Sequence, residues 1–368
     1  MPGNVLINGC FLTHQPTGIQ RFSWEISRRI LTSVDFAQLV IPSNLEIAEG
    51  YDFTGIPNPR RVGVGNARIW EQRTLPRLLH HGDSLWTPAG LGPLYSRAHL
   101  LTVHDLSVLE HPEWFSRKYA TFYRALQPVA IRRASAISAV SYFTKQRIEH
   151  LLGISPDRIT VVGNAVSDDM NSEPQAGDEN VRAKLGIRGR YILAVGSVEP
   201  RKNLARLVTA FGLISKENPD LTLVIVGSQR AIYGSVDLGQ LDPRRIVMTG
   251  YVRNEQLGAL YRGADVFAYP SIYEGFGIPP LEAMACGVPV LTSNVSALPE
   301  VVGDAAVVVD PLDTAAIAAG LQSLIRDTGL RHQCSERGFA RVSSYSWDRS
   351  TSAVLGLLLQ LQSAGTAQ

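Results

Sequence analysis

The chain has 368 residues, of which 45% are hydrophobic and 18% are charged, enough to bury the cores of two domains. Its formal net charge of +2 is too small to indicate a nucleic-acid-binding protein. The cysteines Cys10, Cys286 and Cys334 lie far apart, and no apolar run reaches the ~18 residues of a membrane-spanning helix, so we expect a soluble, reduced, cytoplasmic chain without a zinc site.

Short apolar runs alternate with helical patterns along the first part of the chain. A helix from about Gln20 to Leu31 follows the first run and a glycine-containing loop. Such runs, bounded by turn residues, are typical of parallel strands that are buried on both faces. The strands predicted here are Val5–Ile7, Gln38–Ile41, Ser84–Thr87, His99–Val103, Ala136–Ala139 and Ile159–Val162.

A polar, acidic segment at residues 168–179 indicates a linker, and a second series of strands and helices follows it. The sequence therefore predicts two consecutive doubly wound α/β domains and a final helix from about Ser346 to Leu361. The strands predicted in the second series are Tyr191–Val195, Leu221–Val226, Ile246–Thr249, Val266–Tyr269, Pro289–Thr292 and Ala306–Val309.

Charge is distributed unevenly between the two series. Residues 1–165 carry 17 lysines and arginines against 12 aspartates and glutamates, a balance of +5, whereas residues 166–368 have a balance of −3. The basic first half predicts contact with an anion or a membrane surface, although ordinary scatter of surface charge would give the same numbers.

A glycine-rich loop follows the strand Val266–Tyr269 and leads through Pro279 and Pro280 into a short helix. Prolines suit the first turn of a helix, and free amides at such a position bind phosphate and other anions. The amides expected to be free are those of Phe276, Gly277 and Ile278.

Two glutamates flank this turn, Glu274 on the loop and Glu282 one turn into the helix. A carboxylate makes charge-assisted hydrogen bonds to sugar hydroxyls. An acid near a helix N-terminus is also stabilised by the helix dipole alone, so function and stability are both open for Glu282.

Two adjacent cations, Arg201 and Lys202, follow the strand Tyr191–Val195 and are expected to open the next helix. Cations at a helix N-terminus oppose the dipole unless an anion neutralises them, and a diphosphate would do so. The sequence contains no Asp-x-Asp pair and no Walker A motif. We therefore expect cationic side chains and backbone amides to bind that diphosphate, and we expect no metal ion and no cofactor.

His104 comes directly after the strand His99–Val103, where it could exchange a hydrogen bond with a sugar hydroxyl near a reacting carbon. A lone histidine is more often structural. Gly18 precedes the first helix and would let a substrate approach the backbone.

Together these segments resemble the retaining group 1 (family four) glycosyltransferases of the GT-B fold, especially mannosyltransferases of bacterial polysaccharide and O-antigen assembly. The segments that carry the resemblance are TGIQR at Thr17–Arg21, WEQ at Trp70–Gln72, VHDL at Val103–Leu106, EPRKN at Glu199–Asn203, YEGFGIPPLEAMACGVPV at Tyr273–Val290 and SNVSALPEVVGDAAVVVDP at Ser293–Pro311.

The resemblance implies two Rossmann-like domains that face a central cleft, with the last helix crossing back to the first domain. Residues 1–168 would form the acceptor-binding domain, residues 169–345 the donor-binding domain and residues 346–368 the returning helix.

In the donor-binding domain, the resemblance places Arg201 and Lys202 on the donor diphosphate, Glu274 on the transferred sugar, Glu282 on the ribose hydroxyls and Val252 near the base. In the acceptor-binding domain, it places His104 near the anomeric centre or the 6-hydroxyl. Gly18 would border the phosphates and the acceptor. In the donor-binding domain, the amides of residues 276–278 would assist at the phosphate and sugar.

The implied reaction retains the anomeric configuration by front-side displacement, in which no side chain acts as a nucleophile. The catalytic residues that the resemblance implies are His104 and Glu274. The donor would be a nucleotide sugar, with GDP-mannose favoured and UDP- and dTDP-sugars open. The acceptor would be a glycan or a polyprenyl-diphosphate-linked glycan. A nucleotide-sugar epimerase and a nucleotide-sugar-binding regulatory module are the other functions left open.

Aromatic and basic residues interleave at Trp114–Tyr119 and again at Phe122–Arg124. This composition suits a peripheral contact with the inner face of the cytoplasmic membrane, and it equally suits an amphipathic helix that packs on its own domain.

Overall fold

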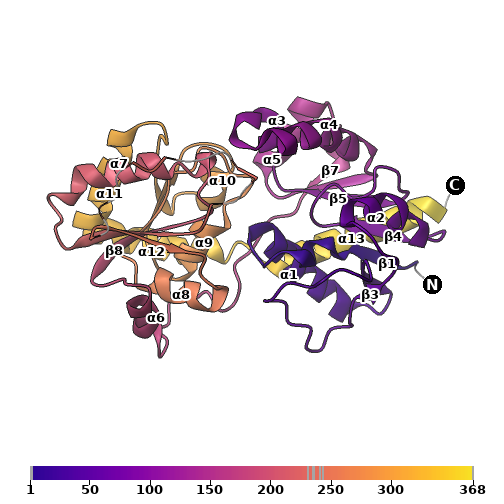
Figure 1. Cartoon of the computed structure of the whole chain (residues 1–368), viewed down its shortest axis with the longest axis horizontal. Coiled ribbons are helices and arrows are strands. Elements are labelled where there is room, and N and C mark those ends of the chain that lie inside the picture. Colours follow the sequence, from indigo (N-terminus) through magenta and orange to yellow (C-terminus); the bar gives the residue numbers. More distant parts are fainter. Residues whose placement is uncertain (1–2, 230–231, 234–236, 240–241, 243, 367–368) are drawn as a thin grey trace. The chain divides into compact units, whose positions relative to one another are not determined.

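The computed structural model describes residues 3–229, 232–233, 237–239, 242 and 244–366 of the chain. It consists of two compact α/β units (Figure 1). Unit 1 comprises Met1–Leu109, Thr121–Asn164 and Ser346–Gln368, and unit 2 comprises Glu110–Ala120 and Ala165–Tyr345. Unit 2 thus includes a short segment that the sequence assigns to the first domain.

Unit 1 contains a parallel sheet of seven strands in the order β3-β2-β1-β4-β5-β6-β7. The order reverses between β1 and β4, which are paired in register from Val5 opposite Ser84. In a doubly wound sheet, ligands bind outside the carboxyl ends of the strands at such a reversal. The strands are β1 (Val5–Asn8), β2 (Ala37–Ile41), β3 (Arg60–Arg61), β4 (Ser84–Thr87), β5 (His99–Val103), β6 (Ala136–Ala139) and β7 (Ile159–Val161).

Unit 2 repeats this plan with a parallel sheet of six strands in the order β10-β9-β8-β11-β12-β13. Its strand order reverses between β8 and β11, which are paired from Val266 opposite Ile192. The strands are β8 (Arg190–Val195), β9 (Leu221–Val226), β10 (Ile246–Gly250), β11 (Val266–Tyr269), β12 (Val290–Ser293) and β13 (Ala306–Val309).

Helices connect the strands in both units. From the N-terminus to the end of β7 they are η1 (Gly9–Thr13), α1 (Gly18–Ser33), α2 (Ala67–Arg73), η2 (Leu75–Leu78), α3 (Ser107–Glu110), η3 (Pro112–Trp114), α4 (Arg117–Arg133), α5 (Tyr142–Leu152) and η4 (Pro156–Arg158). From β7 to the C-terminus they are α6 (Asp178–Lys184), η5 (Pro200–Lys202), α7 (Leu204–Ser215), α8 (Asn254–Arg262), α9 (Ile278–Ala285), α10 (Leu298–Val302), α11 (Thr314–Arg326), α12 (Thr328–Val342) and α13 (Trp347–Thr366).

The predicted strands are present, each with bounds that differ by at most one residue from the prediction. All residues of β1, β4 and β5 are buried, as expected for strands covered on both faces. The sequence did not predict β3, because its two residues, Arg60 and Arg61, are both exposed and give no apolar signal.

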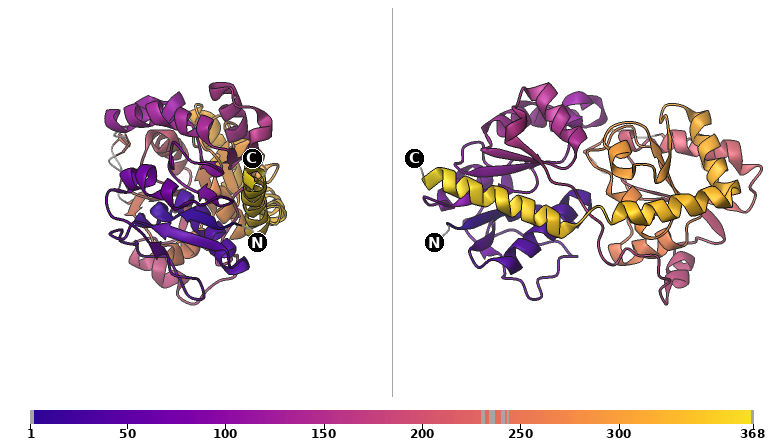
Figure 2. Two further views of the ribbon diagram at one scale, coloured as in Figure 1. Left: turned by 90° about the vertical axis from the view of Figure 1, so that its right-hand side faces the viewer. Right: turned by 180° about the vertical axis from the view of Figure 1, so that it is seen from behind.

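Local signals fix several helix ends. The hydroxyl of Ser141 accepts a hydrogen bond from the Thr144 amide at the start of α5, and Gly153 ends the same helix with a left-handed φ of 64°. Within unit 1, α13 lies along the other elements (Figure 2). Its Ser350 donates to the Gly163 carbonyl at 2.7 Å.

Candidate functional site

Arg201 and Lys202 lie in the turn η5, at the carboxyl end of β8. Gly196 follows β8 with a φ of +152°, and a Cβ there would lie 3.1 Å from Cε of Lys202, so the glycine leaves room for the lysine stem. Arg201 and Lys202 were predicted to open the next helix, but they lie in the short turn η5 that precedes it. The helix α7 begins only after Asn203, whose left-handed φ of 59° separates it from η5.

The side chain of Asn203 anchors this turn to two neighbouring parts of the sheet edge. Its Nδ2 donates to the Pro270 carbonyl at 3.0 Å and to the Pro311 carbonyl at 2.7 Å. The Ile272 amide also donates to the Arg201 carbonyl at 2.7 Å. The turn that holds the cations is therefore joined directly to the loop that follows β11.

Both cations form ion pairs with Glu274 from that loop. Lys202 Nζ lies 2.5 Å from Glu274 Oε1, and Arg201 Nη1 donates to Oε2 at 3.0 Å. Lys202 also donates to the hydroxyl of Tyr269, and Arg201 Nε lies 2.9 Å from Glu199 Oε1. The structure thus brings Glu274 together with Arg201 and Lys202, which the sequence proposed as a separate feature.

This cluster is buried and balanced in charge. Glu199 is 1% exposed, Glu274 5% and Lys202 9%. Burial opposes ionisation of Glu274, but Lys202 and Arg201 outweigh burial and hold the pKa of this carboxyl at about 2. Two carboxylates therefore face two cations in this state, in the position where the sequence predicted that a diphosphate would neutralise the cations.

Glu199 and Tyr269 are further members of the cluster that were not predicted as site residues from the sequence. Glu199 directly precedes η5 and contacts Arg201 two positions further on. Tyr269 is the last residue of β11 and reaches Lys202 only because the fold brings β8 and β11 side by side. Burial and the nearby Glu274 carboxylate raise the pKa of Tyr269, so its hydroxyl stays protonated. The position of Glu199 beside Arg201 and Lys202 in sequence was the available signal.

The loop between β11 and α9 is held in one shape by backbone contacts. The amide of Glu274 donates to Ser296 Oγ at 3.0 Å, and its carbonyl accepts from the Ala297 amide at 3.3 Å. Gly277 has a φ of +109°, and a Cβ there would lie 2.8 Å from Leu298 Cδ2. The backbone angle strains any other residue at this position, and an added Cβ would also press on the Leu298 side chain.

The amides at the start of α9 are available to a ligand. Neither Pro279 nor Pro280 has an amide hydrogen, and no side chain caps the helix. Within the part of the chain that the structure describes, no group accepts a hydrogen bond from the three amides that the sequence singled out, those of Phe276, Gly277 and Ile278. Anion binding by these amides stays a prediction.

Glu282 and Val252 have separate surroundings in unit 2. Glu282 is 3% exposed, and its Oε2 accepts a hydrogen bond from the hydroxyl of Tyr261 at 2.8 Å. Tyr261, on α8, is a further residue that the sequence did not predict. Val252 follows β10, the edge strand of the sheet, and is 6% exposed.

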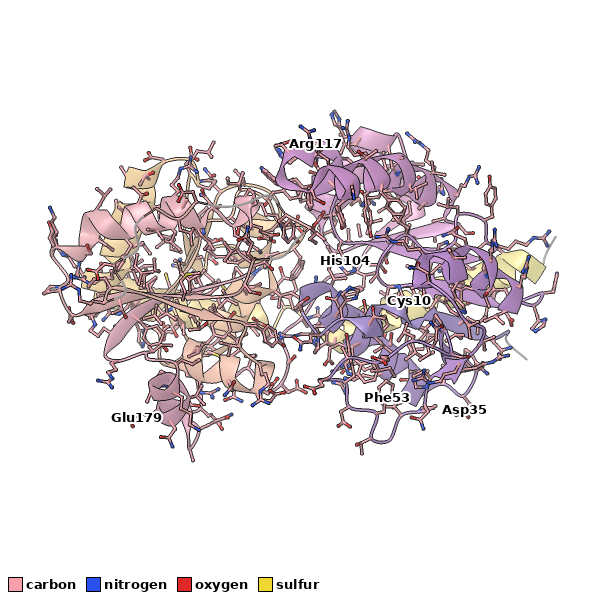
Figure 3. All side chains as sticks on the ribbon, viewed as in Figure 1. Cys10, Asp35, Phe53, His104, Arg117 and Glu179 are labelled. Carbon is pink, nitrogen blue, oxygen red and sulfur yellow. The ribbon has the colours of Figure 1, made fainter. Side chains whose placement is uncertain are left out.

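His104 follows β5 in unit 1 (Figure 3). Its Nε2 lies 2.8 Å from the Pro88 carbonyl, and its ring packs edge-on against Phe22 at 5.1 Å. Burial lowers the pKa of His104, so the ring is neutral near pH 7. Because a carbonyl only accepts hydrogen bonds, Nε2 carries the proton and Nδ1 is the acceptor.

Gly18 is the first residue of α1, and Phe22 lies one turn further along the same helix. Gly18 and His104 therefore lie at the carboxyl edge of the unit 1 sheet, whereas the other predicted site residues belong to unit 2. In unit 2, Arg201, Lys202 and Glu274 follow β8 and β11, the strands between which the order reverses, and a doubly wound sheet binds its ligand at such a reversal.

Two family models match the chain. The model of the group 1 glycosyl transferases matches residues 178–341, and the model of glycosyltransferase family 4 matches residues 17–170. The chain is 35% identical over 304 residues to the O-antigen chain mannosyltransferase B of Escherichia coli, covering 81% of this chain and 77% of that protein.

Other relatives are longer or more distant. The serotype-specific mannosyltransferase WbdA of Escherichia coli is 27% identical over 272 residues, which are 71% of this chain but only 33% of that protein. A sucrose-phosphate synthase from Thermosynechococcus elongatus superimposes with a TM-score of 0.76 at 19% identity, covering 99% of this chain and all of that one.

These matches and the two doubly wound sheets define a glycosyltransferase of the GT-B fold, which confirms the predicted fold class. The chain belongs to the group 1 glycosyltransferases and is related to mannosyltransferases of O-antigen assembly. Among the described helices, none is long and apolar enough to cross a membrane.

Proposed function

We propose that the chain transfers mannose from GDP-mannose, with retention of configuration and without a metal ion, to a glycan or a polyprenyl-diphosphate-linked glycan. The observation that carries this proposal is the cluster of Arg201, Lys202 and Glu274 at the strand reversal of unit 2. It combines two phosphate-binding cations with one carboxylate suited to sugar hydroxyls. The similarity to an O-antigen mannosyltransferase supports mannose as the sugar.

The ion pairs suggest how the donor would bind. The diphosphate would replace Glu274 as the partner of Arg201 and Lys202, and the released carboxylate would accept hydrogen bonds from the transferred sugar. The amides at the start of α9 would add further donors to the same anion. Glu282, oriented by Tyr261, would bind the ribose, and Val252 would contact the base.

In the proposed reaction, the bond from the anomeric carbon to the diphosphate oxygen breaks, and a bond to the acceptor oxygen forms on the same face. The acceptor proton passes to the departing phosphate oxygen, so no protein nucleophile is required. Arg201 and Lys202 stabilise the charge that develops on the leaving group. His104 Nδ1, which accepts in the neutral ring, would orient a hydroxyl of the donor sugar.

Binding of nucleotides tests the donor directly. A ligand that binds only the folded state at a concentration of 100 Kd raises the free energy of unfolding by about 2.7 kcal/mol. We expect GDP and GDP-mannose to raise the Tm selectively in a panel with UDP, dTDP and ADP compounds. Selective stabilisation by a UDP- or dTDP-sugar would mean that this sugar, and not GDP-mannose, is the donor, and the enzyme would still be a glycosyltransferase.

A peripheral membrane contact through α4 is the second part of the proposal. Arg117, Lys118 and Arg124 are exposed on this helix, so a basic surface is available to anionic lipids. Phe122 and Tyr123, however, are half-buried and line a pocket in unit 1. The contact would therefore rest on charge, and vesicles of anionic phospholipid should bind the chain only at low salt.

A further inference from the structure

Unit 1 contains a pocket of about 330 Å³ at its own strand reversal. One wall is the loop after β4, and the other walls are α2 and α4, which come from distant parts of the sequence (Figure 1). The volume lies within the range of about 300–1,000 Å³ that is usual for small-molecule sites. The pocket is therefore placed and sized for a ligand, and none of the residues proposed to bind the donor lines it.

Glu71, on α2, is the buried polar group of this pocket. It is 8% exposed, and its Oε1 accepts a hydrogen bond from Asn8 Nδ2 at 2.7 Å. Asn8 is the last residue of β1, so this bond fixes the carboxyl at the strand reversal. Among the residues that the structure describes, none donates a hydrogen bond to Oε2. Burial raises the pKa of Glu71 to about 7, with the Asn8 hydrogen bond and the charge of Arg68 opposing.

The loop wall is rigid where it meets α2. Gln72 Nε2 donates to the Gly92 carbonyl at 2.7 Å, and Gln72 Oε1 accepts from the Leu94 amide at 2.9 Å. Both hydrogen-bonding ends of the glutamine are thus used to hold the loop. Glu71 and Gln72 belong to the WEQ segment, which therefore has two separate tasks: one residue supports the wall and the other presents a carboxyl to the pocket.

The remaining lining is mostly apolar and aromatic. Phe122 and Tyr123 from α4 meet edge to face at 5.4 Å, and the Arg68 guanidinium lies 4.3 Å over the Phe122 ring. Aromatic faces pack against the C–H face of a pyranose, and a buried carboxylate accepts hydrogen bonds from its hydroxyls. An isoprenoid chain would leave Oε2 of Glu71 without a hydrogen-bonding partner.

We propose that this pocket binds one uncharged pyranose ring of the glycan acceptor, with a ring hydroxyl donating a hydrogen bond to Oε2 of Glu71. The assignment of the ring to the acceptor rests on the proposed function. The binding of a pyranose in the pocket rests only on the geometry of Glu71, Phe122 and Tyr123.

Ligand-observed NMR tests binding without any transfer reaction. The probes are methyl α-mannopyranoside and methyl α-glucopyranoside, with farnesyl diphosphate as the competing chemistry. We expect saturation transfer from the wild type to at least one pyranoside and a Kd at least fivefold higher for Glu71→Gln. Tyr123→Ala, on the opposite wall, should also weaken binding of the same pyranoside.

Asp83→Asn is the matched control, because Asp83 is also a buried carboxyl of unit 1 but lies outside the pocket. It is 7% exposed and accepts from the Asn4 amide at 2.7 Å. This variant should bind the pyranoside like the wild type. GDP-mannose binding, measured on the same samples by thermal shift, should be unchanged by Glu71→Gln.

The two proposals fail in different ways. If pyranosides bind through Glu71 but GDP-mannose neither binds nor serves as donor, the proposed function fails and the pocket stands. Pyranoside affinity that is equal in the wild type, Glu71→Gln and Tyr123→Ala would overturn the pocket assignment. Displacement of the pyranoside by farnesyl diphosphate would overturn it as well, in favour of the lipid part of an acceptor.

Discussion

Lys202 Nζ lies 2.5 Å from Oε1 of Glu274, and Arg201 contacts the second oxygen of the same carboxylate. These ion pairs mean that the residue proposed to bind the sugar is bound to the residues proposed to bind the diphosphate. Removing one member of a buried ion pair leaves an uncompensated charge and costs about 3–5 kcal/mol. Changes at Glu274 should therefore affect stability as well as sugar binding.

Glu274→Gln is expected to reduce transfer from GDP-mannose by more than about 100-fold, in line with the loss of one transition-state hydrogen-bonding group. The variant should not bind GDP more weakly than the wild type, because it removes the negative charge that competes with the phosphates for Arg201 and Lys202. Calorimetric titration with GDP, alongside a transfer assay, measures the two effects. A parallel loss of GDP affinity would contradict the placement of Glu274 on the sugar.

Acid should weaken the fold through the same residue. The pKa of Glu274 is about 2 in the folded chain, below its ordinary value of 4.5, so its contribution to stability is present above pH 4.5 and is lost as the pH falls toward 2. Unfolding in urea between pH 3 and 6 should show a smaller acid loss for Glu274→Gln than for the wild type. Equal pH dependence would show that the pair adds nothing to stability.

Gly277→Ala should destabilise the chain by about 1–3 kcal/mol, because the new Cβ would meet Leu298 at a positive φ. Gly212→Ala is the control. Gly212 lies within α7 with no atom within 4 Å of an added Cβ, so alanine should stabilise that helix by up to about 1 kcal/mol. Urea unfolding measures both changes, and a loss at position 212 as large as that at 277 would refute the steric argument.

Transfer should survive EDTA, since the proposed diphosphate site consists of Arg201, Lys202 and backbone amides. The rate with GDP-mannose, once measured, should be the same within error after dialysis against the chelator. If chelation abolished transfer and Mg²⁺ or Mn²⁺ restored it, the diphosphate site would need a metal ion in addition to Arg201 and Lys202.

The strands were predictable because a strand buried on both faces has a local apolar signature, as β5 and β9 show. Arg201, Lys202 and Glu274 were found because each lies in a short distinctive segment. Their mutual pairing was not predictable, since 72 positions separate Lys202 from Glu274 and only the adjacency of β8 and β11 joins them. The bond between Asn8 and Glu71 spans 63 positions and was hidden for the same reason.

Glu71 should also make the stability of the chain depend on pH in the neutral range. Its pKa is about 7 in the folded chain, above the ordinary value of 4.5 that applies to the unfolded chain, so the folded state binds the proton more tightly. The stability that this proton provides is fully present below pH 4.5 and is lost as the pH rises through 7. A shift of that size corresponds to about 3 kcal/mol.

Glu71→Gln removes this titration, because the amide stays neutral while Oε1 can still accept from Asn8. The difference in the free energy of unfolding between the variant and the wild type should therefore favour the variant increasingly from pH 5 to pH 8. Cys10 and Arg68 surround the carboxyl, but burial and Glu71 raise the pKa of the Cys10 thiol, so it does not titrate in this interval. Urea unfolding at half-unit pH steps measures the curve. A constant difference across the range would mean that Glu71 is ionised throughout, with its charge already compensated in the pocket.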